Sequence, residues 1–154
     1  MARYRTILDC YTDEPAGLGV PPFLGAWPRY AAGRYKKLPA YITIDDLRLA
    51  QMKRPPKLDP PEGKTRIEVL NTTRAPEQTR EILSKTDQLT VILGVHTPGK
   101  YLSAKPGTLK EVARLLGNYK FTKILTGPVV TGGSQLRGGA KAQIPAAEHF
   151  DHIR

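Results

Sequence analysis

The stretch that decides the fold is an apolar run just past the middle of the chain, Leu89-Thr90-Val91-Ile92-Leu93-Gly94-Val95. Such a run is typical of a strand that a parallel sheet buries on both faces. Shorter strands rich in apolar and β-branched residues are expected over 4–10, 41–44 and 121–126. Helices are expected between them, over 29–36, 45–52, 76–83 and 109–116. This alternation predicts a Rossmann-like three-layer α/β domain with a mostly parallel sheet.

The length of 154 residues fits a single domain, 1–154, because a chain of this size can bury a sizeable core. The 14 prolines and 14 glycines exceed the usual shares of about 5% and 7%, so many stiff loops are expected. Four of the prolines lie in 53–65, among mixed charges, and predict a projecting segment. Residues 66–70 form a weaker candidate strand.

Several classes of protein are excluded by what the chain lacks. Its one cysteine, Cys10, rules out an internal disulfide and any cysteine-only metal or iron–sulfur site within the chain. No apolar run approaches the roughly 20 residues of a membrane span, and no signal peptide is recognisable, so a soluble cytoplasmic protein without membrane contact is expected. Neither a G-x-G-x-x-G fingerprint after the first strand nor a phosphate-binding P-loop is present, which argues against nucleotide hydrolysis.

The formal net charge of +10 is concentrated in two stretches. Residues 29–66 carry ten basic and four acidic side chains, and residues 96–141 carry eight basic and one acidic. A field of this sign attracts RNA, DNA, a phosphate-bearing cofactor or an acidic partner. A solvated basic surface without a partner explains the same composition, so both interpretations stay open.

Three loops are expected to meet at one edge of the sheet, because parallel strands all end on the same side. They are 9–25, 94–107 and 126–139, and ligands of open α/β sheets bind in the crevice outside these carboxyl ends. The candidate cofactor-binding residues are polar residues and glycines of these loops: Asp9, Tyr11, Asp13, Glu14, His96, Thr97, Gly99, Lys100, Gly127, Gly132 and Gly133. No catalytic residue and no metal ligand is assigned.

The roles expected in this crevice follow from residue type. Asp13 and Glu14 would accept hydrogen bonds, His96 and Lys100 would donate them, and the backbone of 127–133 would approach a ligand closely. Each feature also has a structural interpretation, because strand-end acids and histidines commonly bond backbone groups and glycines form tight turns. Cys10 is expected to be a buried, inert thiol.

The sequence also carries a family resemblance. The longest motif is Asp9-Cys10-Tyr11-Thr12-Asp13-Glu14-Pro15-Ala16-Gly17-Leu18-Gly19-Val20-Pro21-Pro22. With the segments 27–33, 41–48, 94–102 and 127–129, it resembles the N-terminal domain of archaeal radical S-adenosylmethionine proteins. The resemblance implies a cobalamin-binding-like accessory domain that is not catalytic alone, and that holds a cofactor or substrate and covers the reactive face of a partial barrel.

Two departures from that family matter. The cluster motif C-x-x-x-C-x-x-C is absent, so S-adenosylmethionine and an iron–sulfur cluster are expected only in a catalytic domain outside this chain. The D-x-H-x-x-G pattern that ligates cobalt is absent as well, so cobalamin, the cofactor that the resemblance implies, would bind without a histidine ligand. The pair Gly132-Gly133 resembles the glycines near the nucleotide tail of cobalamin.

Two alternatives from other classes remain. The first is a basic RNA-binding module, with Arg29, Tyr30, Arg34 and Tyr35 interleaved on one expected helix that could stack on bases and pair with the backbone. The second is a purely structural partner of a separately encoded barrel, for which an exposed apolar patch would be the sign.

Overall fold

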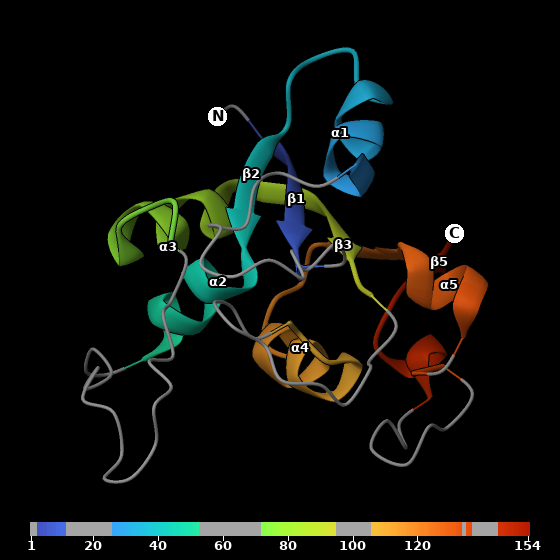
Figure 1. Ribbon diagram of the computed structural model, residues 1–154. Helices are drawn as coiled ribbons and strands as arrows, with labels where there is room; N and C mark the ends of the chain where they lie inside the picture. The colour runs from blue at the N-terminus through green and yellow to red at the C-terminus, as the bar shows by residue number, and fades with distance from the viewer. Residues whose placement is uncertain (1–2, 12–25, 53–71, 95–105, 134, 137–144) are drawn as a thin grey trace, which may run out of the picture.

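The computed structural model describes residues 3–11, 26–52, 72–94, 106–133, 135–136 and 145–154. Its centre is a five-stranded sheet in which every neighbouring pair of described strands runs parallel, in the order β2-β1-β3-β4-β5 (Figure 1). The strands are β1 (Tyr4–Asp9), β2 (Ala40–Thr43), β3 (Thr86–Ile92), β4 (Thr122–Thr126) and β5 (His152–Ile153). The expected Rossmann-like α/β fold is confirmed.

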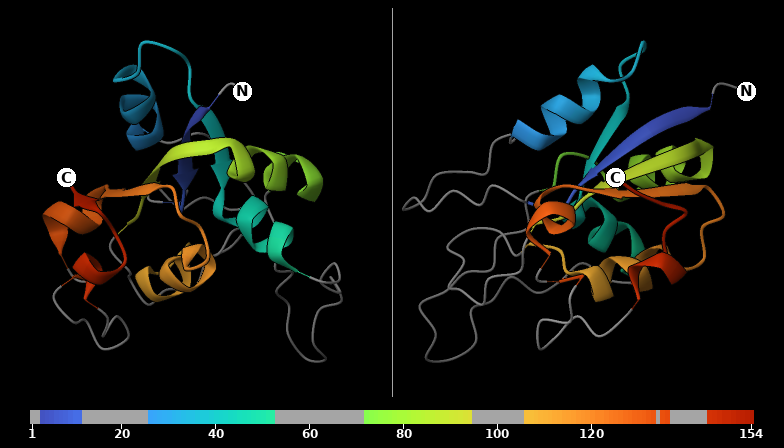
Figure 2. Two further views of the ribbon diagram at one scale, coloured as in Figure 1. Left: turned by 180° about the vertical axis from the view of Figure 1, so that it is seen from behind. Right: turned by 90° about the vertical axis from the view of Figure 1, so that its right-hand side faces the viewer.

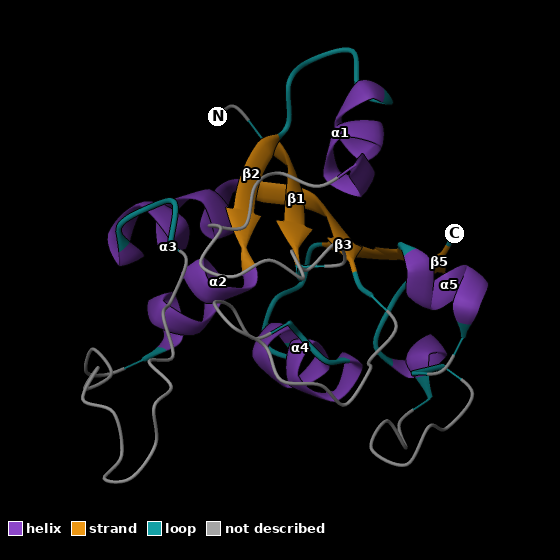
Figure 3. Cartoon of the chain, in the orientation of Figure 1, coloured by secondary structure: helices purple, strands orange, loops and turns teal. Residues whose placement is uncertain are grey.

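Helices cover both faces of this sheet (Figures 2 and 3). Helix α1 (Ala26–Gly33) lies on one face, over β1 and β3. Helices α2 (Ile44–Gln51), α3 (Pro76–Lys85) and α4 (Leu109–Leu116) lie on the other. Two short elements follow β4: helix α5 (Pro128–Gly132) and the 3₁₀ helix η1 (Ala146–Glu148). The layers thus follow from parallel strands that need crossover connections.

The main core fills the space between the sheet and the helices α2, α3 and α4. Leu8, Val91 and Leu125 are partners across three strands and are fully buried. They belong to one apolar cluster with Leu83 of α3 and Leu116 of α4. Because side chains alternate along a strand, the neighbouring row on these strands faces α1 instead.

The start of α2 is set by a capping box. The Thr43 hydroxyl accepts from the Asp46 backbone N–H at 3.1 Å, and the Asp46 carboxylate accepts from the Thr43 N–H at 2.9 Å. These reciprocal bonds satisfy two donors that a helix start leaves unpaired. Strand β2 therefore ends at Thr43, and Ile44, expected in the strand, is the first residue of the helix.

The bounds of α1 and β3 also differ from those expected. Helix α1 begins three residues earlier, at Ala26, because Pro28 falls within the first turn, where its missing N–H needs no partner. It ends at Gly33, so Arg34 and Tyr35 do not lie on the helix. Strand β3 begins at Thr86, since its polar first residues already pair with β1. Helix α4 has the expected bounds, 109–116, with Thr108 as its cap.

Three elements were not expected from the sequence. Helix α5 lies in what was expected to be an irregular loop, 126–139, and η1 and β5 follow it. Strand β5 pairs through only two residues, which is too short for an alternating hydrophobic pattern to predict it. The projecting segment 53–65 and the candidate strand 66–70 lie outside the described residues.

Candidate ligand site at the carboxyl edge of the sheet

The strand order places a topological switch point between β1 and β3. Strand β2 lies on one side of β1 and β3 on the other, so the connections that leave β1 and β3 turn to opposite faces of the sheet. In open α/β sheets this geometry opens a crevice at the carboxyl ends of the two central strands. The candidate site is therefore at the ends of β1 and β3.

Backbone hydrogen bonds join the described ends of the three expected loops. The Cys10 N–H donates to the Ile92 carbonyl at 3.1 Å, and the Leu93 N–H donates to the Thr126 carbonyl at 3.0 Å. The Gly107 N–H donates to the Cys10 carbonyl at 3.1 Å. Three segments distant in the sequence thus meet at one edge, as the parallel topology predicted.

Asp9 is the last residue of β1 and is almost completely buried. One carboxylate oxygen accepts from the Tyr11 backbone N–H at 3.0 Å, and the other accepts from the Tyr41 hydroxyl at 2.7 Å. Burial, reinforced by the nearby Asp9 charge, raises the pKa of Tyr41. Tyr41 therefore acts as a hydrogen-bond donor that orients the Asp9 carboxylate.

Tyr11 follows in a backbone conformation that side chains rarely adopt, with φ of 60°. Its buried hydroxyl donates to the Asp45 carboxylate at 3.1 Å, and burial, followed by the Asp45 charge, raises its pKa. A non-glycine residue in this region persists when its surroundings hold it there. The bonds to Asp9 and Asp45 supply that restraint at the point where the first loop leaves the sheet.

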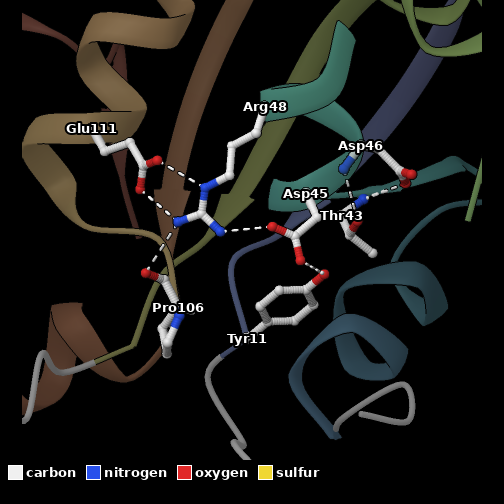
Figure 4. Close-up of polar contacts among 7 residues, drawn as sticks. All are labelled: Tyr11, Thr43, Asp45, Asp46, Arg48, Pro106 and Glu111. Carbon is white, nitrogen blue, oxygen red and sulfur yellow. Dashed lines mark hydrogen bonds and ion pairs between the residues drawn. The ribbon is translucent and has the colours of Figure 1, made fainter. Parts of the chain in front are cut away.

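A partly buried ion-pair bridge through Arg48 joins Asp45 to Glu111 (Figure 4). The Arg48 guanidinium donates to Asp45 Oδ1 at 2.8 Å and to both carboxylate oxygens of Glu111, each at 2.8 Å. Burial alone would lower the pKa of Arg48, but its bonds to Glu111 and Asp45 outweigh that effect and raise it. The bridge ties α2 to α4 and fixes the carboxylate that Tyr11 meets.

The second acid of α2 has a structural role. Besides its part in the capping box, Asp46 accepts from the Thr73 N–H at 2.7 Å, the Thr73 hydroxyl at 2.6 Å and the Arg74 N–H at 3.1 Å. These bonds fasten the segment that precedes α3 to the start of α2. Asp46 is thus fully occupied in holding the edge of the sheet together.

The glycines after β4 are explained largely by packing. Gly127 has φ of 105°, and a Cβ at this position would lie 2.7 Å from the Leu93 carbonyl oxygen. Gly133 ends α5 in the left-handed conformation, and its N–H donates to the Val129 carbonyl. Gly132 is the last residue of that helix. A helix therefore occupies 128–132, where an irregular glycine-rich loop was expected.

Cys10 is buried at the same edge of the sheet. Its thiol is fully buried, and a Cβ added to Gly107 would lie 3.0 Å from the Cys10 Cβ. Burial, reinforced by the Asp9 charge, raises the pKa of the thiol well above its usual range. The protonated thiol is therefore a packing group in the native state.

Stability is expected to fall as the pH rises above about 8.5, where the Cys10 thiol ionises in the unfolded chain. The native thiol keeps its proton because its pKa is raised, so the unfolded state binds fewer protons and the slope is negative, at about 1.4 kcal/mol per pH unit. Tyr11 and Tyr41, whose pKa values are also raised, should steepen the fall above about pH 10. Urea unfolding between pH 7.5 and 10.5 measures this dependence.

The matched variant for this measurement is Cys10→Ala. Its absolute stability is lowered by the small void, but its stability should stay level until the tyrosines ionise near pH 10. Equal slopes for the two proteins between pH 8.5 and 10 would show that the thiol is not the titrating group.

The structure brings together only part of the predicted set. Asp9 and Tyr11 lie at the switch point, and Gly127 packs against the end of β3. Six other predicted residues lie outside the described part of the chain: Asp13, Glu14, His96, Thr97, Gly99 and Lys100.

The sequence did not identify the residues that support these two side chains. Tyr41, Asp45 and Arg48 lie in segment 41–48 of the family resemblance, but no role was assigned to them. Arg48 and Glu111 are separated by 63 residues. Asp45 and Asp46 were only placed within the helix expected over 45–52. Gln135 was missed as well; its side-chain oxygen accepts from the Leu109 N–H at 2.7 Å and so links the chain after α5 to the start of α4.

The donor set does not fit a histidine-ligated cobalamin. The chain has three histidines, and none precedes His96, so neither the end of β1 nor the first loop offers an imidazole. Within the described residues, no group of three or more His, Cys, Asp or Glu side chains could hold a metal ion. Nor is any helix in the described part long and apolar enough to cross a membrane.

Two archaeal proteins are similar to the chain. One is an uncharacterized protein of Methanocaldococcus jannaschii, 43% identical over 137 residues, which covers 86% of this chain. The other is an uncharacterized protein of Archaeoglobus fulgidus, 34% identical over 132 residues, which covers 84% of this chain. The chain spans about 20% of the length of each relative. No protein-family model and no solved structure matches the chain.

Proposed function

We propose that the chain is the accessory N-terminal domain of a larger archaeal protein and holds a cofactor or substrate at the carboxyl edge of its sheet. The observation that carries this proposal is the arrangement at the switch point. There a buried carboxylate, Asp9, ends β1, and Tyr11 is held in a rare conformation by two hydrogen bonds. Both features are typical of a binding edge, because strain of this kind concentrates at ligand sites.

The radical S-adenosylmethionine class is our proposal for the larger protein. It is supported by the resemblance of segments 9–22, 27–33, 41–48, 94–102 and 127–129 to the N-terminal domain of that class. The similarity of the chain to about one fifth of two longer archaeal proteins agrees with the role of one domain among several. The reactive cluster and its cysteines would lie outside this chain, since it has a single cysteine.

The chain's own residues would position a ligand. The Asp9 carboxylate, oriented by the Tyr11 N–H and the Tyr41 hydroxyl, places a charged acceptor at the end of β1. The bridge through Arg48 holds the Asp45 carboxylate against the Tyr11 hydroxyl, so the edge is rigid before a ligand arrives. A rigid edge lowers the entropy that binding must overcome.

The partner that we propose for this edge is the barrel domain itself, whose reactive face the edge would cover. RNA, the other partner that the sequence suggested, is proposed for a separate surface at the opposite end of the sheet. Under both proposals the protein would act in the cytoplasm.

Calorimetric titration of the chain with S-adenosylmethionine and with cobalamin tests the site. We expect cobalamin to bind without a histidine ligand, whereas S-adenosylmethionine, whose site is expected outside this chain, should not bind. Asp9→Asn should weaken cobalamin binding at least about tenfold, because a charged hydrogen-bond acceptor is lost. The Tyr11 N–H can still donate to the amide oxygen, and the Tyr41 hydroxyl can turn to accept from the amide NH2, so the variant should fold.

The matched control is Asp87→Asn, which makes the same change near the amino end of β3, where the exposed carboxylate pairs only weakly with Arg3 at 3.3 Å. Its binding should equal that of the original chain. The proposal fails if cobalamin does not bind, or if Asp9→Asn and Asp87→Asn bind it alike.

A further inference from the structure

A basic segment without a single acid lies on the far side of the fold from the candidate site. Residues 15–44 contain no Asp or Glu. Within them, the part from 29 to 38, called the basic segment below, contains Arg29, Arg34, Lys36 and Lys37, all exposed. Among the described residues, no carboxylate forms an ion pair with Arg34, Lys36 or Lys37.

The basic segment is anchored to the sheet. Beyond the end of α1, the Arg34 N–H donates to the Ala31 carbonyl at 3.3 Å and the Tyr35 N–H to the Ala32 carbonyl at 3.1 Å. The Tyr35 hydroxyl lies 2.7 Å from the Thr90 hydroxyl. Tyr35 is thus directed toward the sheet. Its contact with Thr90 anchors the backbone between Arg34 and Lys36.

Two large side chains of the basic segment face water. Tyr30 is 77% exposed and Leu38 is 92% exposed. Tyr30 lies on the last turn of α1, next to Arg29 in the sequence, and the exposed Arg34 follows in the turn just beyond the helix. An exposed ring among cations offers both a stacking platform and charges for a backbone of phosphates.

The apolar side of α1 is turned to the protein, which leaves little for a lipid. Pro28 is buried and Trp27 is partly buried, so the exposed surface holds one aromatic ring and one leucine besides the cations. A helix that lies in a membrane interface needs a broad exposed apolar face instead. The cations of the basic segment and the exposed Tyr30 ring suit a single-stranded nucleic acid better than a lipid surface.

The part of the basic segment that follows α1 lies away from the carboxyl edge. Helix α1 runs against the direction of the strands, so its last residues and the chain up to β2 lie at the amino end of the sheet (Figure 1). A ligand at the switch point and a partner at the basic segment would not compete for one surface.

We infer that the basic segment binds single-stranded RNA, with Tyr30 stacking on a base and Arg34, Lys36 and Lys37 contacting phosphates. Cations at the end of α1 also stabilise the helix dipole, but that effect fades within the last turn and does not require Lys36 and Lys37. This surface is independent of the ligand site proposed above.

The test is fluorescence polarisation of the chain with a labelled 12-nucleotide oligouridylate between 50 and 200 mM salt. The triple variant R34Q/K36Q/K37Q should weaken binding at least about tenfold at the lowest salt and reduce the salt slope by about 2. Tyr30→Ala should weaken binding roughly five- to a hundredfold with an unchanged slope, because stacking and not charge is lost.

The matched control is K110Q/R114Q/K120Q, which removes three exposed cations on and just after α4. It should bind the oligonucleotide within about threefold of the original chain. The inference is overturned if the two triple variants bind alike, if Tyr30→Ala has no effect, or if duplex RNA binds as tightly as the single strand. Asp9→Asn should leave RNA binding unchanged, so failure here and failure of the ligand site are separable.

Discussion

Replacement of Gly127 by alanine is expected to destabilise the native state by about 3–5 kcal/mol. The backbone at Gly127 has φ of 105°, which an alanine adopts only with strain. The new Cβ would also lie 2.7 Å from the Leu93 carbonyl oxygen and 3.0 Å from the Leu93 nitrogen. Leu93 cannot retreat freely, because its N–H donates to Thr126 and its carbonyl accepts from Val129.

Urea unfolding followed by far-ultraviolet circular dichroism and by the fluorescence of Trp27 measures this loss. The melting temperature should fall by roughly 6–20 °C for a chain of this length. The control is Gly117→Ala, where the backbone is right-handed helical and the nearest atom to a new Cβ lies 3.5 Å away. That variant should be neutral or more stable by up to about 1 kcal/mol. A loss below about 1 kcal/mol in Gly127→Ala would refute the tight contact between the ends of β3 and β4.

The second large effect is expected from Arg48→Met, at about 3–5 kcal/mol of lost stability. The Arg48 side chain is 10% exposed and the Asp45 side chain 1%. Removal of the guanidinium therefore leaves the buried Asp45 carboxylate without the positive charge that compensates it. Glu111, whose side chain is 23% exposed, can turn toward water and loses less. The loss should also release Tyr11, because its hydroxyl bonds to the same Asp45 carboxylate.

A double variant separates the cost of the uncompensated Asp45 charge from the loss of packing. Arg48→Met combined with Asp45→Asn should recover about 1–3 kcal/mol, since a neutral amide is easier to bury than an unpaired carboxylate. The matched control Arg3→Met breaks an exposed pair with Asp87 and should cost less than about 1 kcal/mol. Equal losses in Arg48→Met and Arg3→Met in urea unfolding would mean that the bridge contributes little.

The fold was predictable where the signal lies within a few residues. Helix α4 has both of its ends marked in the sequence, by the Thr108 cap and by Gly117, and its bounds are as expected. The run 89–95 identified the central strand, although pairing with β1 moves the observed strand to Thr86–Ile92. Strand β5 has two residues and no pattern of its own, so only its pairing with β4 defines it.

The position of the candidate site was predictable from the sequence, but the residues that hold its side chains in place were not. Asp9 and Tyr11 were found because they follow a strand in a parallel sheet. Arg48 and Glu111 lie on helices 63 residues apart, and no local pattern relates them. Tyr35 shows the converse error: it was expected on a helix with three other RNA-binding candidates, but its hydroxyl meets the sheet at Thr90.

The place of β1 between β2 and β3 has a consequence for how the chain folds during synthesis. Strand β1 is made first, yet its partner β3 follows much later; Thr6 and Thr86, which meet across the two strands, are separated by 80 residues. At roughly 5–20 residues per second, the ribosome leaves the apolar end of β1 without that partner for about 4–16 s. Of the described strands, only β2 can pair with it during this interval, so the other edge of β1 stays open to a chaperone until β3 is made.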